Sequence, residues 1–312
     1  MKLLMPAGRL RSLLMLLLVL AGGQVTGQTN VSPLTWSNNS VSSSFTSAAS
    51  WVGGTGSTTV PDASTLVQFM STGQPVVQPL LSTQAAVLGM TFLQSSPSYN
   101  LTTQLTSGVS LTVGQLGILN QSSLAQTIAV PLILPGATGA NVTPVPVSSN
   151  GSGALFLSGP VAVGAAGVSF GSSAGGSGVV SGVVTSVAQT AGKLTVAGGT
   201  WSFSGANTFT GSVEITGGTM VLASSGALPA SKPLLLNPAA GLFATVEIAG
   251  QSAVTAGNIT FLGARYSSST LSLAPSASLN LTGNLVYDAS GRPGMANITG
   301  GTLALGATTR TF

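Results

Sequence analysis

The 312-residue sequence predicts an all-β protein, a parallel β-helix (β-solenoid) with an N-terminal β-rich capping region. One phrase occurs three times, as VAGGTWSF at Val196–Phe203, ITGGTMVL at Ile215–Leu222 and ITGGTLAL at Ile298–Leu305. The first two phrases begin 19 residues apart, and the third begins 83 residues after the second, about four units of 21. A period near 20 with alternating apolar residues is typical of stacked β-solenoids. After the N-terminal segment, no window shows the 3.6-residue apolar period of a helix.

Residues 1–27 have the pattern of a secretory signal peptide. Three basic residues open the segment: Lys2, Arg9 and Arg11. An apolar run from Leu13 to Ala21 and then small residues follow, in the order that a signal peptide requires. Cleavage is expected after Gly23 or Gly27. The run is shorter than the ~20 residues of a membrane-spanning helix, so a retained N-terminal anchor is the less favoured alternative.

Without the signal peptide the chain is almost uncharged. Five basic residues remain: Lys193, Lys232, Arg265, Arg292 and Arg310. Four acids oppose them, for a net charge of +1: Asp62, Glu214, Glu247 and Asp288. Nucleic acid is not an expected partner, because phosphate binding needs clustered Lys or Arg. Cysteine is absent, so no disulfide framework supports the exported chain.

Residues 28–108 are predicted to form the N-terminal β-rich cap. They hold six aromatic residues: Trp36, Phe45, Trp51, Phe69, Phe92 and Tyr99. A solenoid needs a specialised end, because an open first coil exposes strand edges and an apolar interior. We expect Trp36 and Trp51 to fill the first layer of the core. The alternative is a small sugar-binding module that uses exposed Trp side chains.

Residues 109–312 are predicted to form the parallel β-helix. Short alternating apolar segments recur there, separated by Gly, Asn, Ser or Pro. Aligning the phrases predicts that three pairs of inward residues stack in neighbouring coils: Val196 with Ile215, Trp201 with Met220, and Phe203 with Leu222. Ile298 is expected at the position of Ile215. The paired glycines should supply turn conformations that other residues avoid. Alternation directs Glu214 and Glu247 outward, as solvated surface positions.

The segment 199–229 resembles the autotransporter-associated β-strand repeat, also called the passenger-associated transport repeat. The resemblance is clearest in the turn Gly205–Gly211 (GANTFTG) and the following Gly-Gly-Thr strand. A looser similarity covers the N-terminal run, with two Trp residues, a Pro61-Asp62 turn and the sequence Leu88–Phe92 (LGMTF). The resemblance implies a right-handed parallel β-helix passenger that is secreted or lies at the cell surface of a Gram-negative-type bacterium. It assigns no catalytic residue.

No amphipathic strands of a translocator barrel precede Thr311-Phe312. The sequence is therefore interpreted as a truncated or incompletely predicted reading frame, whose association with the outer membrane requires a translocator that this chain does not contain.

The residues for common catalytic chemistry are missing. Histidine and cysteine are absent, which excludes Ser-His-Asp and Cys-His nucleophiles and the usual zinc sites. Paired-carboxylate hydrolysis needs two acids about 5–10 Å apart, and Glu214 with Glu247 is the one candidate pair. Arg265-Tyr266 and Arg292 are interpreted as loop residues rather than substrate clamps. No catalytic, metal-binding or cofactor-binding residue is therefore predicted.

These observations predict a non-enzymatic exported bacterial surface protein with a structural or adhesive role. Its binding would be spread over repeated Thr, Asn and Ser faces, and its expected partners are surface glycans or the surfaces of host or neighbouring cells. No small-molecule cofactor is expected. The alternative is a polysaccharide-binding or polysaccharide-active protein on the same scaffold.

Overall fold

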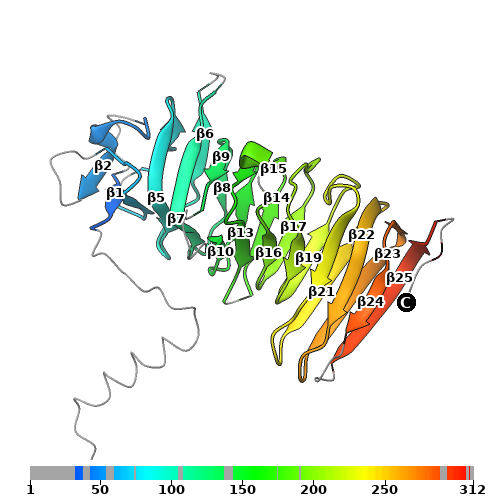
Figure 1. Ribbon diagram of the computed structural model, residues 1–312. Coiled ribbons are helices and arrows are strands. Elements are labelled where there is room, and N and C mark those ends of the chain that lie inside the picture. Colours follow the sequence, from blue (N-terminus) through cyan, green and yellow to red (C-terminus); the bar gives the residue numbers. More distant parts are fainter. Residues whose placement is uncertain are drawn as a thin grey trace, which may run out of the picture. The chain divides into compact units, whose positions relative to one another are not determined.

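The computed structural model of the chain describes residues 32–37, 43–53, 60–73, 75–104, 108–136, 143–173, 175–189, 191–288, 294–306 and 309 (Figure 1). The predicted signal peptide, residues 1–27, lies outside the described residues. The described residues belong to one compact unit, Ser32–Phe312.

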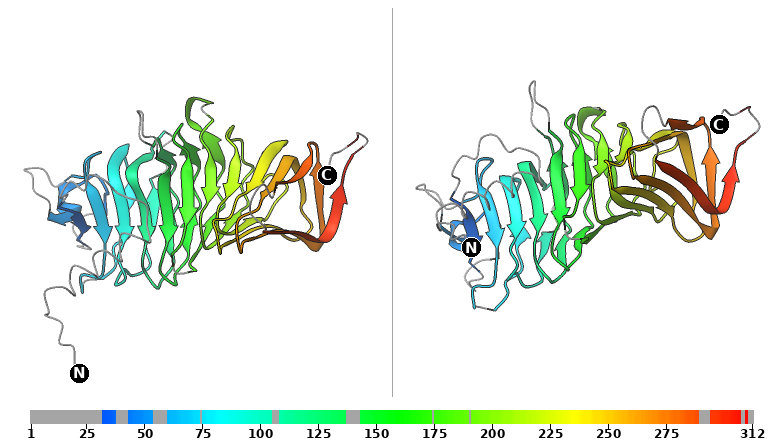
Figure 2. Two further views of the ribbon diagram at one scale, coloured as in Figure 1. Left: turned by 60° about the horizontal axis from the view of Figure 1, so that its bottom comes forward. Right: turned by 90° about the horizontal axis from the view of Figure 1, so that it is seen from below.

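This unit is a β-solenoid, which confirms the predicted fold class. About nine parallel coils stack on one another, and each coil neighbours the preceding and the following one (Figure 2). Among the described residues there is no α-helix; two single turns of 3₁₀-helix occur, η1 (Ala48–Ser50) and η2 (Val187–Gln189).

The parallel strands form three faces. Face 1 contains β1 (Leu34–Trp36), β3 (Leu66–Phe69), the ends of β5 (Ala85–Phe92) and β7 (Leu111–Asn120), β10 (Val145–Ser149), β13 (Val168–Gly171), β16 (Leu194–Val196), β18 (Val213–Ile215), β20 (Lys232–Leu236), the end of β22 (Ala253–Leu262) and β24 (Leu285–Asp288).

Face 2 contains β4 (Leu80–Leu81), β6 (Asn100–Thr103), β8 (Gln126–Ile128), β11 (Leu155–Leu157), β14 (Ser177–Val180), β17 (Thr200–Phe203), β19 (Gly218–Leu222), β21 (Phe243–Ile248), the start of β23 (Ser268–Leu281) and the start of β25 (Met295–Ala304). Face 3 contains the starts of β5 and β7, β9 (Leu132–Leu134), β12 (Val161–Val163), β15 (Val184–Ser186), the start of β22 and the ends of β23 and β25.

The first two copies of the repeated phrase have the predicted register. Val196 pairs with Ile215 on face 1, and on face 2 Trp201 pairs with Met220 and Phe203 with Leu222. The corner between these faces depends on the second glycine of each pair. Gly218 has φ +73°, and a Cβ there would lie 2.3 Å from the carbonyl oxygen of Gly199 in the preceding coil. Only glycine fits this corner without displacing backbone.

The third copy does not occupy the predicted position. Ile298 pairs with Leu271 on face 2, whereas Ile215 lies on face 1. The phrase has therefore moved by one corner of the solenoid. Its glycines, Gly300 and Gly301, turn the chain between faces 2 and 3 instead of between faces 1 and 2.

The coils vary in length, which explains this shift. On face 1 the residues in register are Ile215, Leu236, Phe261 and Tyr287. The successive coils therefore contain 21, 25 and 26 residues. The 83-residue spacing spans three coils and one further corner, not four coils of 21. A sequence period reports the mean length of a coil, while the turns absorb the variation.

The inward side chains of all three faces form one hydrophobic cluster that extends from Leu34 to Leu281. Its N-terminal layer is aromatic: the Trp51 ring lies 5.1 Å from that of Trp36 and 5.0 Å from that of Phe45, both edge to face. Both Trp side chains are buried. They fill the core as predicted, and they are not the exposed Trp of a sugar-binding module.

An antiparallel strand covers this end of the solenoid. β2 (Trp51–Gly53) pairs with β1, while β1 also pairs in parallel with β3. The parallel stack therefore includes β3 and β5, well before residue 109. The region predicted as a cap, residues 28–108, contains both the covering strand and the first coils.

Candidate functional site

The structure does not bring together the two carboxylates that the sequence offered as a candidate pair. Glu214 lies on β18, in face 1, and Glu247 lies on β21, in face 2. They project outward from different faces of the solenoid, because each stands between two inward neighbours. The other acids are also separate: Asp62 lies in the turn before β3, and Asp288 ends β24. The arrangement provides no pair of cooperating carboxylates.

Glu214 is not a solvated surface residue, contrary to the prediction. Its side chain points outward, yet the residue is only 7% exposed. One carboxylate oxygen pairs with Lys193 Nζ, and Asn237 Nδ2 donates to the other at 2.7 Å. Burial raises the pKa of Glu214, but the two hydrogen bonds and the Lys193 charge outweigh burial and hold the pKa below its ordinary value.

The contacts of Glu214 have a simple origin in the stacking. Lys193 precedes β16 and Asn237 follows β20, so the three side chains belong to three successive coils of face 1. Alternation along one strand predicts the direction of a side chain correctly. It does not predict which side chains from the coils above and below will cover it.

Asp62 has a structural task in the predicted Pro61-Asp62 turn. Its Oδ1 accepts hydrogen bonds from Ser64 N at 2.9 Å, Ser64 Oγ at 2.7 Å and Thr65 Oγ1 at 2.8 Å. These donors, with the Ser64 hydroxyl foremost, lower the pKa of Asp62. The carboxylate thereby closes the turn that leads into β3.

The Asn of the GANTFTG turn is likewise structural. Asn207 is buried; its Oδ1 accepts from Val184 N at 2.8 Å, and its Nδ2 donates to Ala227 O at 2.7 Å. Val184 belongs to the preceding coil and Ala227 to the following one. β15 is the face 3 strand of the preceding coil, and the coil of Asn207 has no strand at this position, between β17 and β18. The side-chain amide therefore replaces ladder hydrogen bonds at this corner of face 3. This explains why Asn stands there.

The outward side of face 2 carries a column of hydroxyl and amide side chains. Successive register partners on six strands form it: Ser177, Thr200, Thr219, Thr245, Thr270 and Asn297. Neighbouring members are about 4.8 Å apart, the spacing of paired strands. This column is the repeated Thr, Asn and Ser surface that the sequence predicts.

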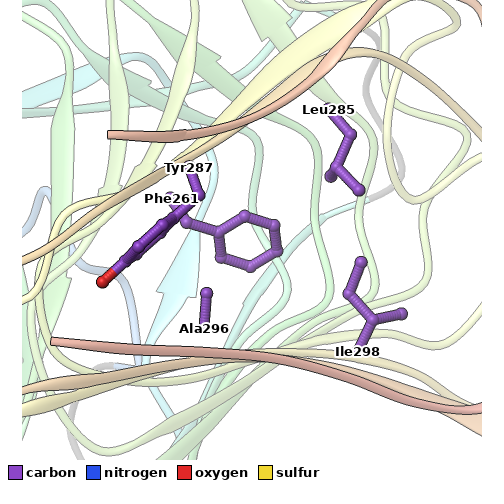
Figure 3. Close-up of a pocket in the computed structure, with 5 residues that line it drawn as sticks. All are labelled: Phe261, Leu285, Tyr287, Ala296 and Ile298. Carbon is purple, nitrogen blue, oxygen red and sulfur yellow. The ribbon is translucent and has the colours of Figure 1, made fainter. Parts of the chain in front are cut away.

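An apolar cavity of about 230 Å³ lies in the last coil that the structure describes (Figure 3). It is lined by Phe261, Leu285, Tyr287, Ala296 and Ile298. Phe261, Tyr287 and Ile298 continue the inward columns of faces 1 and 2. Tyr287 and Ile298 are nevertheless 47% and 38% exposed, so the cavity is a solvent-accessible hollow at the end of the described core. Its lining contains no titratable group except the Tyr287 hydroxyl, which donates to Gly294 O at 2.6 Å.

A second hollow, of about 280 Å³, lies at the corner that contains the GANTFTG turn. Its lining includes Thr208, Ser225, Pro229 and Thr255, with the buried Asn207 behind them. None of its lining residues is charged. Hydroxyl groups without an acid, a base or a cation supply hydrogen bonds but no means of activating a nucleophile.

The Arg265-Tyr266 dipeptide lies on a loop, as predicted, between β22 and β23. The structure adds that Tyr266 is 77% exposed and that the Arg265 guanidinium carbon lies 5.0 Å from the centre of its ring. Arg292 lies outside the described residues.

Within the described ranges, no group of three or more Asp, Glu, His or Cys side chains could hold a metal ion. The same residues include no helix that is long and apolar enough to cross a bilayer. Comparisons of the chain with protein families, with curated proteins and with solved structures find no match.

Proposed function

We propose that the chain is an exported, non-enzymatic surface protein of the autotransporter-associated repeat type, with a structural or adhesive role. The observation that supports this proposal is the single uninterrupted stack of coils. One core runs through it, and a column of hydroxyl and amide side chains repeats from coil to coil on the outward side of face 2. Such a surface suits extended contact along a face.

The placement of the charged groups supports a role without catalysis. Glu214 already accepts hydrogen bonds on both carboxylate oxygens, and Glu247 stands on another face. A glycosidase needs one free acid and one base or nucleophile across a single bond. The structure offers no such pair, so the polysaccharide-active alternative has no observation in its favour.

The coil architecture also suits export of an unfolded chain. In a solenoid each coil contacts only its neighbours, so coils fold one after another as the chain emerges. No disulfide has to form, because the chain has no cysteine. These properties, with the signal-peptide pattern of residues 1–27, support secretion to the cell surface of a Gram-negative-type bacterium.

Two measurements test the proposal. An antibody raised against the purified protein should label intact cells of the source bacterium, and external protease should remove the signal. The purified protein should release no reducing ends from a panel of plant, algal and bacterial polysaccharides. Labelling confined to permeabilised cells would contradict surface location. Hydrolysis that is abolished by the double substitution Glu214→Gln and Glu247→Gln would contradict the non-enzymatic role.

A further inference from the structure

Exposed apolar side chains gather at one corner of three successive coils, where face 1 turns into face 2. Leu242, Phe243, Tyr266 and Met295 are 45%, 66%, 77% and 63% exposed. Together with Arg265 we call these residues the corner patch. They belong to the turns or strand starts at β21, β23 and β25; the first two turns, in yellow and orange, lie side by side along the lower edge of the stack in Figure 1.

The register of face 2 makes the corner patch contiguous. Phe243 pairs with Ser268, and Ser268 pairs with Met295. All three point outward, because their next neighbours along the strands, such as the buried Ala244 and Ser269, point inward. Adjacent strands are about 4.8 Å apart, so the Phe243 and Met295 backbones are about 10 Å apart. The surface between them has the width of a few sugar rings.

Tyr266 is held in place by its turn. Ser267 N donates to Ala264 O at 3.0 Å, and the Ser267 hydroxyl donates to the same oxygen at 2.6 Å. Gly241 N in the neighbouring turn donates to Arg265 O at 3.1 Å. Tyr266 has φ +60°, a conformation that a bulky side chain rarely adopts. Such backbone strain persists only where the surroundings fix it, and it concentrates at functional sites.

Arg265 gives the corner patch its charge. The one ion pair that joins two described residues is Lys193 with Glu214, so Arg265 has no carboxylate partner among them. The Arg265 guanidinium instead lies over the exposed ring of Tyr266. A guanidinium is planar, and its N–H donors can form two parallel hydrogen bonds to the oxygens of a carboxylate. The corner patch therefore combines an aromatic platform with a cation that no carboxylate neutralises within this part of the chain.

Hydrogen-bonding side chains border the platform. Thr245, Thr270 and Asn297 stand two residues beyond Phe243, Ser268 and Met295 on the same outward side of face 2. An apolar surface beside a row of hydroxyl and amide groups matches a pyranose ring, which has an apolar C–H face and a hydroxylated edge. Tyr suits such amphipathic contact, since its ring is apolar and its tip polar.

We propose that the corner patch binds a carboxylated polysaccharide, with sugar rings packed on Tyr266 and Phe243 and a uronate carboxylate paired with Arg265. A membrane surface fits less well, because anionic lipids attract clusters of Lys and Arg and the described residues of the patch include one cation. A specific protein interface usually covers about 800 Å² on each partner, more than these few side chains present. The proposal rests on the adhesive role above and names its ligand.

The test uses the purified protein and two polysaccharides with the same sugar backbone, polygalacturonate and its uncharged methyl ester. Titration calorimetry should show binding to polygalacturonate that is at least about tenfold tighter than to the ester. Tyr266→Asn removes the ring but tolerates the positive φ, and it should weaken binding at least tenfold, whereas Tyr266→Phe should retain it. Phe243→Thr should also weaken binding.

Arg265→Gln should abolish the preference for the acidic polymer while leaving binding of the ester unchanged. Leu124→Ala is the matched control, because Leu124 is 50% exposed on a distant coil, and it should bind as the wild type does. Circular dichroism establishes that every variant is folded. The proposal is overturned if neither polymer binds, if Tyr266→Asn binds unchanged, or if the protein pellets with phosphatidylglycerol vesicles but ignores both polymers. These failures leave surface labelling unaffected, so they are distinguishable from failure of the proposed function.

Discussion

Substitution of the single residue Ile215 tests which side chains of a strand point into the core. It is fully buried on face 1 between Val196 and Leu236. We expect Ile215→Asp to cost about 4 kcal/mol or more in free energy of unfolding, because a buried carboxylate has no partner there. Ile215→Val should cost only about 1 kcal/mol. Urea denaturation of both variants measures the difference; equal losses would mean that the position is not in the core.

Glu214 and Glu247 provide a matched pair of outward acids. We expect Glu214→Ala to destabilise the protein by about 1–2 kcal/mol, because it removes the acceptor of Asn237 and Lys193. Lys193 is half-exposed, so solvent screening keeps the ion pair's share small. Glu247→Ala should change stability by about 0.5 kcal/mol or less, because Glu247 is exposed. The same denaturation measurement decides between them, and equal effects would contradict the burial of Glu214.

The lowered pKa of Glu214 predicts a dependence on pH. The folded pKa lies below the unfolded one, so folding is favoured by the ionised carboxylate. This stabilisation is fully present above the unfolded pKa of about 4.3 and is lost as the pH falls through the folded pKa. The loss of stability in Glu214→Gln should therefore be largest near pH 7 and shrink below about pH 4. If the loss of stability in Glu214→Gln instead increased as the pH falls, the lowered pKa of Glu214 would be contradicted.

At the scale of an element, Asn207 replaces part of a strand. Its amide joins the coil of Val184 to the coil of Ala227. Asn207→Ala should cost about 2–3 kcal/mol, because a buried N–H and a buried C=O both lose their partners. Asn258→Ala is the control: Asn258 Oδ1 accepts from Asn284 N at 2.8 Å, but at an exposed position. Thermal unfolding measures the stability of both variants. If Asn258→Ala lowered stability as much as Asn207→Ala, the stabilising role of the buried Asn207 amide would be contradicted.

Elements were predictable from the sequence where their signal is local. Alternation places Val196, Ile215 and Met220 correctly, because the side-chain period of a strand is two. The position of Ile298 was not predictable, since the lengths of the intervening turns decide which face a phrase occupies. The same Gly-Gly-Thr sequence occurs at different corners of the solenoid. It therefore specifies a turn followed by a strand, but it does not specify which face the strand joins.

The candidate sites depend on contacts between coils, which a single sequence does not specify. Burial of Glu214 arises from residues 21 positions before and 23 positions after it. The apolar neighbours of Tyr266 in the corner patch belong to other coils, and the register of face 2 brings them beside it. The sequence did contain one signal: an Arg-Tyr dipeptide in a chain with only 4% charged residues. The dipeptide becomes part of a larger surface only in the structure, which places Phe243, the first residue of β21, in the neighbouring coil.

At the scale of the whole unit, a solenoid transmits a defect through its nearest neighbours. Face 1 joins β18 only to β16 and β20, and the core is a chain of such layers. We expect Ile215→Asp to raise amide hydrogen exchange in these three strands, while β5 and β7, several coils away, keep the protection of the wild type. Ile215→Val, which leaves the layer apolar, should change exchange little. Mass-spectrometric exchange on both variants measures this profile. A uniform rise across all faces would show that the coils unfold as one cooperative unit, and it would contradict the nearest-neighbour description of this fold.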